Sequence, residues 1–151
     1  MTEHEHYDVL IIGGGQAGIP LAHAQPGREV VLLEAERRKC RFLEEWAPPN
    51  ARVVWGRAEE QPTEWAGTAV AKALAHPPTA AEWCLPLVRE GGAVVLWVGP
   101  SADVERVAAV AARIAGEVAD APEGFLVLRK VGPTPPGFPR RVGVAKKRPL
   151  A

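Results

Sequence analysis

The stretch Tyr7-Asp8-Val9-Leu10-Ile11-Ile12-Gly13-Gly14-Gly15-Gln16-Ala17-Gly18 decides the fold of this chain. Its first half contains a continuous apolar run, which is typical of a parallel strand covered on both faces. Gly13, Gly15 and Gly18 follow at G-x-G-x-x-G spacing. Small residues at these positions allow a tight turn, close approach of a ligand to the backbone and close packing of the next helix. The stretch therefore predicts a strand, a glycine turn and a helix around a ligand site.

A carboxylate ends the next predicted strand. Glu34 follows the apolar run Val30-Val31-Leu32-Leu33 and comes sixteen residues after Gly18. In βαβ nucleotide sites an acid at this place accepts hydrogen bonds from ribose hydroxyls. Strand, glycine turn, helix, strand and acid together favour a nucleotide-type ligand far more than the glycines do alone.

The remaining chain alternates between strand-like and helix-like segments. Further strands are expected at 28–33, 52–55, 66–73, 93–98 and 125–131. Helices are expected at 16–24, at 36–46 and at 79–90, the last interrupted by Pro86, with a fourth helix capped by Ser101 that keeps its apolar period to Val118. Such alternation predicts an α/β protein with a Rossmann-like, doubly wound sheet. Residues 56–60 then follow the third strand at its carboxyl end, the edge at which such sheets bind ligands.

The sequence also predicts the burial of several aromatic, cysteine and histidine side chains. Phe42, Leu43 and Trp46 are expected to face the sheet, and Trp46, Trp55 and Trp97 to lie in the core, while Trp65 and Trp83 fit either core or surface. Cys40 and Cys84 are single thiols without metal-ligand spacing, expected to be half-buried in a reduced compartment. His4 and His6 are expected to belong to a solvated terminus, and no metal site is predicted.

The charges balance overall but are unevenly placed. Of the 18 Lys and Arg residues, 7 follow Glu123, the last acid, which leaves 11 bases against 18 acids before it. The basic end indicates either a polyanionic partner or a solvated terminus. No apolar run approaches the length of a membrane span and the polar start lacks a signal-peptide core, so a cytoplasmic protein is expected.

From Gly18 onward the chain resembles the small-subunit ribosomal RNA guanine-N7 methyltransferase G family, also called glucose-inhibited division protein B. The matching segments are Gly18-Ile19-Pro20-Leu21-Ala22, Val31-Leu32-Leu33-Glu34-Ala35, Arg38-Lys39-Cys40-Arg41-Phe42-Leu43, Gly56-Arg57-Ala58-Glu59-Glu60, Leu85-Pro86-Leu87-Val88-Arg89-Glu90-Gly91-Gly92 and the proline-rich basic ending from Arg129 to Leu150. The ending is the most specific of these features, because few folds close on such a proline-then-arginine string.

The resemblance implies a class I methyltransferase with S-adenosylmethionine (SAM) as donor and guanine N7 of 16S ribosomal RNA as acceptor. By position, Gly13, Gly15 and Gln16 would line the methionine and ribose side of SAM, Glu34 would hold the ribose, and Ala58 and Glu59 would lie against the adenine. Lys72 would be a positioning residue at the cofactor. Because N7 carries an available lone pair, its attack on the methyl group needs no general base, and no catalytic acid or base is assigned.

The resemblance also implies a division of the chain and a binding role for its end. Residues 1–131 would form the SAM-binding domain and residues 132–151 a proline-rich basic tail of a monomeric enzyme. The tail would contact RNA phosphates, a contribution to affinity that does not depend on nucleotide sequence. The residues assigned to it are Arg140, Arg141, Lys146, Lys147 and Arg148.

Three departures from the family pattern keep two alternatives open. Val9, Ile11 and Ile12 stand where the family has an acid and a Gly-Ser/Thr-Gly run, Lys72-Ala73 replaces an Arg-Ala pair, and only a few polar residues precede the first strand, where members usually carry a helical segment. A lysine keeps the charge but loses the planar fork of arginine. One alternative is an FAD- or NAD-binding oxidoreductase fragment, because the start resembles a flavoprotein opening. The other is an RNA-binding remnant without catalytic activity.

Overall fold

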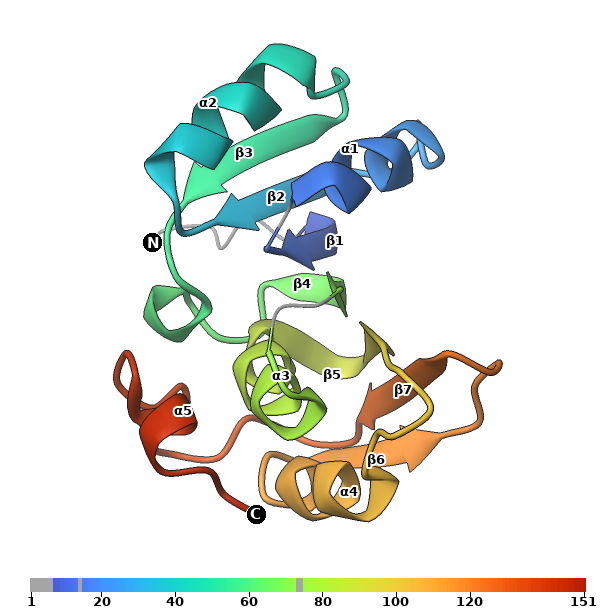
Figure 1. Cartoon of the computed structure of the whole chain (residues 1–151), viewed down its shortest axis with the longest axis vertical. Coiled ribbons are helices and arrows are strands. Elements are labelled where there is room, and N and C mark those ends of the chain that lie inside the picture. Colours follow the sequence, from blue (N-terminus) through green and yellow to red (C-terminus); the bar gives the residue numbers. More distant parts are fainter. Residues whose placement is uncertain (1–6, 14, 73–74) are drawn as a thin grey trace.

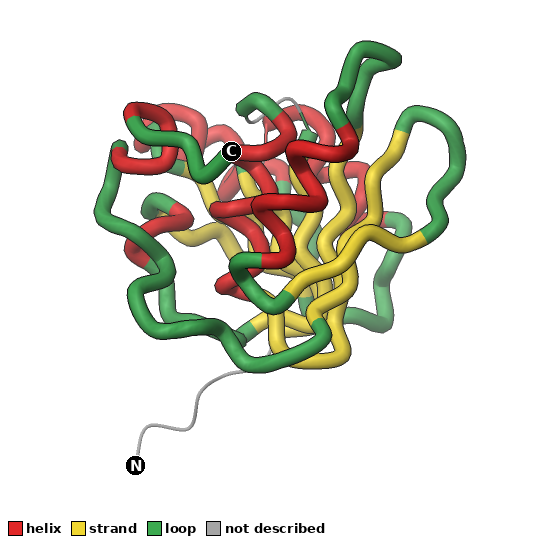
Figure 2. Tube along the Cα trace, turned by 90° about the horizontal axis from the view of Figure 1, so that it is seen from below, coloured by secondary structure: helices red, strands yellow, loops and turns green. Residues whose placement is uncertain are grey.

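A single twisted sheet forms the centre of the molecule. The computed structural model describes residues 7–13, 15–72 and 75–151, and in this part seven strands pair in the order β3-β2-β1-β4-β5-β7-β6 (Figures 1 and 2). The strands are β1 (Tyr7–Ile12), β2 (Val30–Glu34), β3 (Ala51–Trp55), β4 (Ala66–Ala71), β5 (Val88–Trp97), β6 (Gly116–Ala119) and β7 (Phe125–Lys130). The helices are α1 (Gly15–His23), α2 (Arg37–Trp46), α3 (Pro77–Cys84), α4 (Val104–Ala112) and α5 (Val144–Lys147), with 3-10 turns η1 (Ala58–Glu60) and η2 (Leu85–Leu87).

Strand direction divides the sheet into two parts. β1 to β5 are parallel neighbours, whereas β7 runs antiparallel between β5 and β6. β1 and β4 are adjacent although α1, β2, α2 and β3 lie between them in the chain. The strand order therefore reverses beside β1, and an open α/β sheet binds its ligand at the carboxyl ends of the strands at such a point. The predicted α/β, Rossmann-like fold is confirmed.

Alternating side chains of the central strands fill two separate cores. Leu10 and Ile12 of β1 pack on the face covered by α3 and α4, while Val9 and Ile11 pack on the face where α1 and α2 lie. The period of two in a strand sends neighbouring side chains to opposite faces. This explains the unbroken apolar run in the sequence, because both faces of β1 are covered.

Two glycines make the first turn possible. Gly13 has φ 68°, in the left-handed region that side chains other than glycine adopt only with strain. A Cβ on Gly18 would lie 3.0 Å from Leu32 Cδ2, so even alanine there would force the Leu32 side chain to shift by a few tenths of an ångström. The predicted roles of the glycine spacing in turning the chain and in packing the helix are thus visible at these two positions.

The helix expected over residues 79–90 is wrong in its second half. α3 ends at Cys84, the turn η2 follows, and β5 already begins at Val88, which pairs with Ala66. Pro86 has no amide proton and cannot continue a helix. β5 also contains Gly91 and Gly92, so it begins five residues before the strand expected at 93–98.

The next helix is also shorter than its apolar period suggested. Its cap is Asp103, whose side chain accepts a hydrogen bond from Arg106 N, and not Ser101. α4 ends at Ala112, and Ala115 has φ 55°, which turns the chain into β6. Val118 therefore lies in a strand paired with β7, a strand that the sequence analysis did not predict.

Three aromatic side chains expected inside are on the surface. Phe42, Trp46 and Trp55 are 52%, 58% and 59% exposed. α2 covers only the β2–β3 edge of the sheet. The narrow stripe of Cys40 and Leu43 is therefore the part of the helix that is buried against the strands. Leu43 is buried as expected, Trp97 is half-buried, and Trp65 and Trp83 are both core residues.

Both cysteines are buried, not half-buried as expected. Burial raises the pKa of Cys84 to about 12 and, together with the charge of Glu34, raises the pKa of Cys40. Within the described residues no group of three His, Cys, Asp or Glu side chains could hold a metal, and no helix has the length and hydropathy to cross a membrane. His4 and His6 lie outside the described residues.

A buried lysine attaches the C-terminal segment to the body of the protein. Lys130, at the end of β7, is 1% exposed and donates to Leu85 O at 2.9 Å, Val88 O at 2.8 Å and Thr134 Oγ1 at 2.7 Å. Thr134 N also donates to Glu64 Oε1 at 3.1 Å. These bonds fix the direction in which the chain leaves the sheet, and the following residues return across α3 to form α5 (Figure 1).

Candidate functional site

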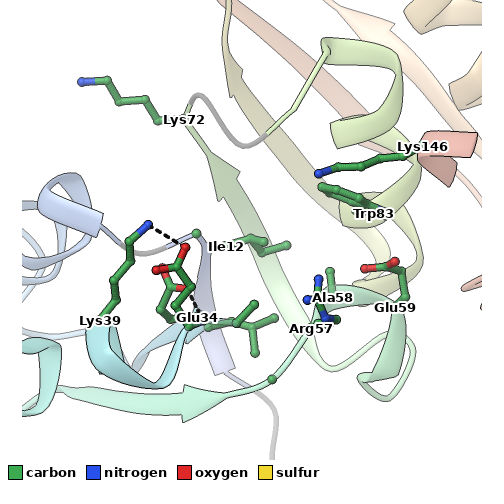
Figure 3. Close-up of a pocket in the computed structure, with 14 residues that line it drawn as sticks. Ile12, Glu34, Lys39, Arg57, Ala58, Glu59, Lys72, Trp83 and Lys146 are labelled. Atoms are coloured by element: carbon green, nitrogen blue, oxygen red, sulfur yellow. Dashed lines mark hydrogen bonds and ion pairs between the residues drawn. The ribbon is translucent and has the colours of Figure 1, made fainter. Parts of the chain in front are cut away.

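A cavity of about 340 Å³ opens at the carboxyl ends of β1, β2 and β4. This volume is within the range of small-molecule sites. Its lining comes from the end of β1, the β2–α2 connection with the first turn of α2, the segment after β3, the residue after β4, and the helices α3 and α5 (Figure 3). The lining residues are Ile12, Gly13, Leu33, Glu34, Ala35, Glu36, Lys39, Gly56, Arg57, Ala58, Glu59, Lys72, Trp83 and Lys146.

Glu34 supplies the buried acid of this cavity. It is the last residue of β2, which lies between β1 and β3, and it is only 6% exposed. Its Oε2 accepts a hydrogen bond from Glu36 N at 2.7 Å, and Oε1 has no hydrogen-bond partner among the described residues. Cys40 Sγ donates to the Glu34 carbonyl at 3.4 Å and fixes the backbone below it. The carboxylate is thus held in place with one oxygen available to a hydroxyl donor.

The turn η1 forms the wall across from Glu34. Ala58 is buried and small, so it leaves room for a flat group, and Glu59 stands beside it (Figure 3). Glu59 Oε2 accepts a hydrogen bond from Gly143 N at 2.9 Å. This residue, assigned to the cofactor from sequence, therefore also holds the C-terminal segment at the cavity.

Trp83 and Lys146 form a further wall that the sequence analysis did not assign. The Lys146 ammonium lies 5.4 Å from the centroid of the Trp83 ring, and both residues line the cavity (Figure 3). Trp83 lies in α3 and Lys146 in α5, 63 positions later in the sequence. No local spacing links them, and only the return of the chain across α3 brings them together.

A salt bridge docks the C-terminal segment on α3. Arg140 Nη2 donates to Glu82 Oε2 at 2.7 Å and Arg140 Nε donates to Glu82 Oε1 at 2.5 Å, a two-pronged pair in which Glu82 is 4% exposed. The hydrogen bond to Glu82 raises the pKa of Arg140. Arg140 Nη2 also donates to Arg148 O at 2.9 Å, and Ala145 is buried between these contacts. The guanidinium of Arg140 is therefore committed to holding the segment.

A second hollow of about 530 Å³ collects the other cations of this segment. It is lined by Gly137, Pro139, Arg140, Arg141, Val144, Lys147 and Arg148. Arg141, Lys147 and Arg148 are exposed. The structure thus brings four of the five residues assigned to RNA to one place, and it places the fifth, Lys146, in the cavity of Glu34.

The remaining predicted residues stand at the β1 and β4 ends. Gly13 lines the cavity directly, and Gly15 and Gln16 form the first turn of α1, with the Gln16 side chain and Gly14 outside the described part. Lys72 follows β4 at the rim, and its exposed side chain extends away from Trp83 and Lys146 (Figure 3). Ala73 also lies outside the described residues.

The residues that line the cavity fit an adenosine-type cofactor. A buried carboxylate can accept from ribose hydroxyls, small Ala58 leaves space for a base, and the positive-φ turn at Gly13 lets the backbone approach the ligand. Both the cavity and the acid lie at the carboxyl edge beside the reversal of strand order. The arrangement can bind and orient a nucleoside, and no residue in it is poised as a nucleophile.

Solved structures of methyltransferases share this fold. The antibiotic-resistance methyltransferase Kmr superposes with a TM-score of 0.63 at 18% identity, covering 84% of this chain and 89% of that one. The 16S rRNA N2 methyltransferase RsmC of T. thermophilus, in complex with AdoMet and guanosine, gives 0.61 at 18% identity over 85% of this chain and 36% of that one. The sheet and its edge cavity thus define the architecture of class I SAM-dependent methyltransferases.

Sequence comparison narrows this class to a family. The profile of the GidB family, described as rRNA small subunit methyltransferase G, matches residues 3–120. Proteins named ribosomal RNA small subunit methyltransferase G from Symbiobacterium thermophilum and Moorella thermoacetica are 37% and 36% identical, over 91% and 94% of this chain and 67% and 69% of their own lengths. The chain belongs to the rRNA small subunit methyltransferase G family, as its sequence predicted.

Two further facts follow from these comparisons. The chain spans about two thirds of the length of these relatives. Neither alternative, a flavin or nicotinamide oxidoreductase fragment or an inactive remnant, finds support in the relatives or in the fold. The predicted enzyme class is therefore confirmed at the level of the family.

Proposed function

We propose that this chain binds SAM in the Glu34 cavity and transfers its methyl group to guanine N7 of 16S ribosomal RNA in the cytoplasm. The single observation that carries the proposal is the pairing of Glu34 with the Ala58-Glu59 turn across one cavity at the carboxyl edge of the sheet. Family membership supports the acceptor, because the relatives are named for methylation of the small-subunit rRNA. Bound SAM supplies an activated methyl group on its sulfonium.

The described residues have the task of binding and orientation. Glu34 accepts from the ribose hydroxyls, Ala58 and Glu59 border the adenine, and the Gly13 turn meets the methionine side, with Gly15 and Gln16 beyond it. Lys72 stands at the same rim. Guanine N7 attacks through its own lone pair, so alignment of acceptor and donor is the main contribution asked of the protein.

The C-terminal segment has two tasks in this proposal. Arg141, Lys147 and Arg148 present exposed charges to RNA phosphates around the second hollow, as the sequence had suggested for the basic end. Arg140 holds the segment through Glu82, and Lys146 completes the cofactor cavity on Trp83. The basic end therefore connects the cofactor to the RNA.

Two measurements test this function. Calorimetric titration should show saturable binding of SAM or its demethylated product and none of FAD or NAD. Incubation with SAM and unmethylated small ribosomal subunits, followed by nucleoside mass spectrometry, should reveal N7-methylguanosine in 16S rRNA. FAD binding without SAM binding would overturn the proposal, and so would methylation at a position other than N7.

A further inference from the structure

The outer face of α2 combines exposed aromatic rings with guanidinium groups. Arg38, Phe42 and Trp46 follow one another at intervals of four, so they form one stripe on the helix. Phe42 and Trp46 have ring centroids 6.5 Å apart, and both rings are more than half exposed. Large exposed aromatic groups next to one another are typical of a contact surface.

Trp55 extends this face to the end of β3. Arg37 lies over the Trp55 ring, with its guanidinium carbon 4.8 Å from the ring centroid. Trp55 Nε1 donates to Ala35 O at 3.0 Å, which fixes the indole although it is 59% exposed. β3 is the edge strand of the sheet, and no other strand of the described residues pairs with its outer side.

The charges of α2 are arranged against the stability of the helix itself. Arg37, Arg38 and Lys39 occupy its first turn, whereas Glu44 and Glu45 occupy its last. A helix is stabilised by the opposite order, because its N-terminal end is partially positive. Arg38 and Arg41 also have no hydrogen-bond or ion-pair partner among the described residues. The unpaired arginines suit a negatively charged partner outside the protein.

The basic end of α2 lies directly at the cofactor cavity. Ala35, which binds Trp55, lines that cavity, and so do Glu36 and Lys39 of the helix start. Gly56 and Arg57, which follow Trp55, are also lining residues. An RNA strand bound at the rim of this cavity would therefore lie beside this face.

We propose that Arg37, Arg38, Arg41, Phe42, Trp46 and Trp55, here called the α2 platform, bind an unpaired stretch of RNA next to the target guanine. The rings provide flat faces on which bases stack regardless of their sequence, and the arginines contact the phosphates between them. The platform rests on the proposed function and assigns the RNA a second contact, because the hollow lined by Arg141, Lys147 and Arg148 is formed by a different part of the chain.

A second copy of the protein is the competing occupant of this face. A symmetric, antiparallel contact between two α2 helices would set Arg38 and Arg41 of one copy near Glu44 and Glu45 of the other. RNA is favoured because its backbone brings a negative charge to each unpaired arginine while its bases offer flat partners to the exposed rings. Measurements of RNA binding and of self-association separate the two occupants.

The test compares variants of the whole chain by fluorescence anisotropy with a labelled, unstructured oligoribonucleotide. The Phe42→Ala/Trp46→Ala double variant should bind about 5-fold or more weakly, the lower end for loss of one stacked base. Arg38→Ala should flatten the dependence of log affinity on log salt by about 0.7. Val104→Ala on α4 and Arg113→Ala directly after it, towards the opposite end of the sheet, are matched controls that should bind RNA like the wild type (Figure 1).

The outcomes separate the platform from the proposed function. SAM affinity of the double variant should equal that of the wild type, which shows that the cofactor cavity is intact. Unchanged RNA affinity in the α2 variants would overturn the platform, and so would a change in sedimentation without a change in RNA affinity, which would indicate a protein contact. Failure of the wild type to bind SAM or to transfer methyl groups would overturn the proposed function instead.

Discussion

Lys146 and Lys147 are neighbours in the sequence, yet they line different cavities. Lys146 borders the cavity of Glu34 and lies over Trp83, whereas Lys147 borders the hollow with Arg141. Successive residues of a helix point about 100° apart, so the short helix α5 divides two cations between two surfaces. This relationship allows the cofactor and RNA roles of the segment to be tested separately.

Lys146→Ala should weaken SAM binding by roughly 0.5–1.5 kcal/mol, the range for one lost hydrogen bond, and should leave the salt dependence of RNA binding unchanged. Lys147→Ala should do the reverse, flattening that dependence by about 0.7–0.9 with no effect on SAM. Calorimetry and anisotropy measure the two effects, and each variant is the control of the other. Equal effects of both variants would contradict the division.

Glu34→Ala should reduce SAM affinity by roughly 1–3 kcal/mol, because hydrogen bonds to a charged group are lost. Glu45→Ala, an exposed acid of α2, is the matched control and should bind SAM normally. Calorimetric titration measures both variants, and circular dichroism confirms that the fold is retained. A Glu34→Ala variant with wild-type affinity would remove Glu34 from the cofactor site.

Lys72→Ala should lower SAM affinity, and Lys72→Arg should maintain or improve it, since arginine supplies the planar fork that the sequence resemblance implies at this position. The structure places Lys72 at the rim with an exposed side chain, so the expected effect is less than about 1 kcal/mol. Calorimetric titration of both variants with SAM measures these affinities. Neutral behaviour of both would leave Lys72 as a solvated residue at the end of a strand.

Arg140→Ala should lower the free energy of unfolding by roughly 2–4 kcal/mol, because it leaves the buried carboxylate of Glu82 without its partner. Arg141→Ala, the exposed neighbour, should change it by less than about 0.5 kcal/mol. Urea unfolding followed by circular dichroism measures both. If the two variants were equally stable, the segment would not depend on the Glu82 contact.

The buried Lys130 predicts a pH dependence of stability. Burial lowers its pKa from 10.5, against the opposing charges of Glu64 and Glu90. In the window between the lowered pKa and 10.5 the unfolded chain binds more protons than the folded one, so the contribution of Lys130 to stability rises with pH there and levels off above 10.5.

Comparison with Lys130→Met isolates this contribution. The difference in unfolding free energy between wild type and variant should increase as pH rises through that window. The variant should also be less stable at every pH, by roughly 2–4 kcal/mol, because the acceptors of Leu85, Val88 and Thr134 lose their donor. A difference that is flat with pH would show that the pKa of Lys130 is not lowered.

Local patterns determined the parallel half of the sheet and one wall of the site. The run from Val9 to Ile12 predicted a covered strand, and the spacing of Gly13 and Gly18 predicted a tight turn with a closely packed helix. Glu34 was expected to end the next strand at the same edge. These features depend on residues that are near one another in the sequence, within one βαβ unit, so the local sequence is enough to predict them. The family resemblance rested on the same segments and was confirmed.

The tertiary structure alone decided the other walls and the exposed face. Trp83 meets Lys146, Glu82 meets Arg140 and Glu59 meets Gly143 because the chain returns across α3 after Lys130 is anchored, and no local period records that return. Phe42 and Trp46 followed a helical period that suggested burial, but α2 covers only the edge of the sheet. An amphipathic pattern shows which side chains prefer burial, whereas the area of the opposing surface determines how many of them are buried.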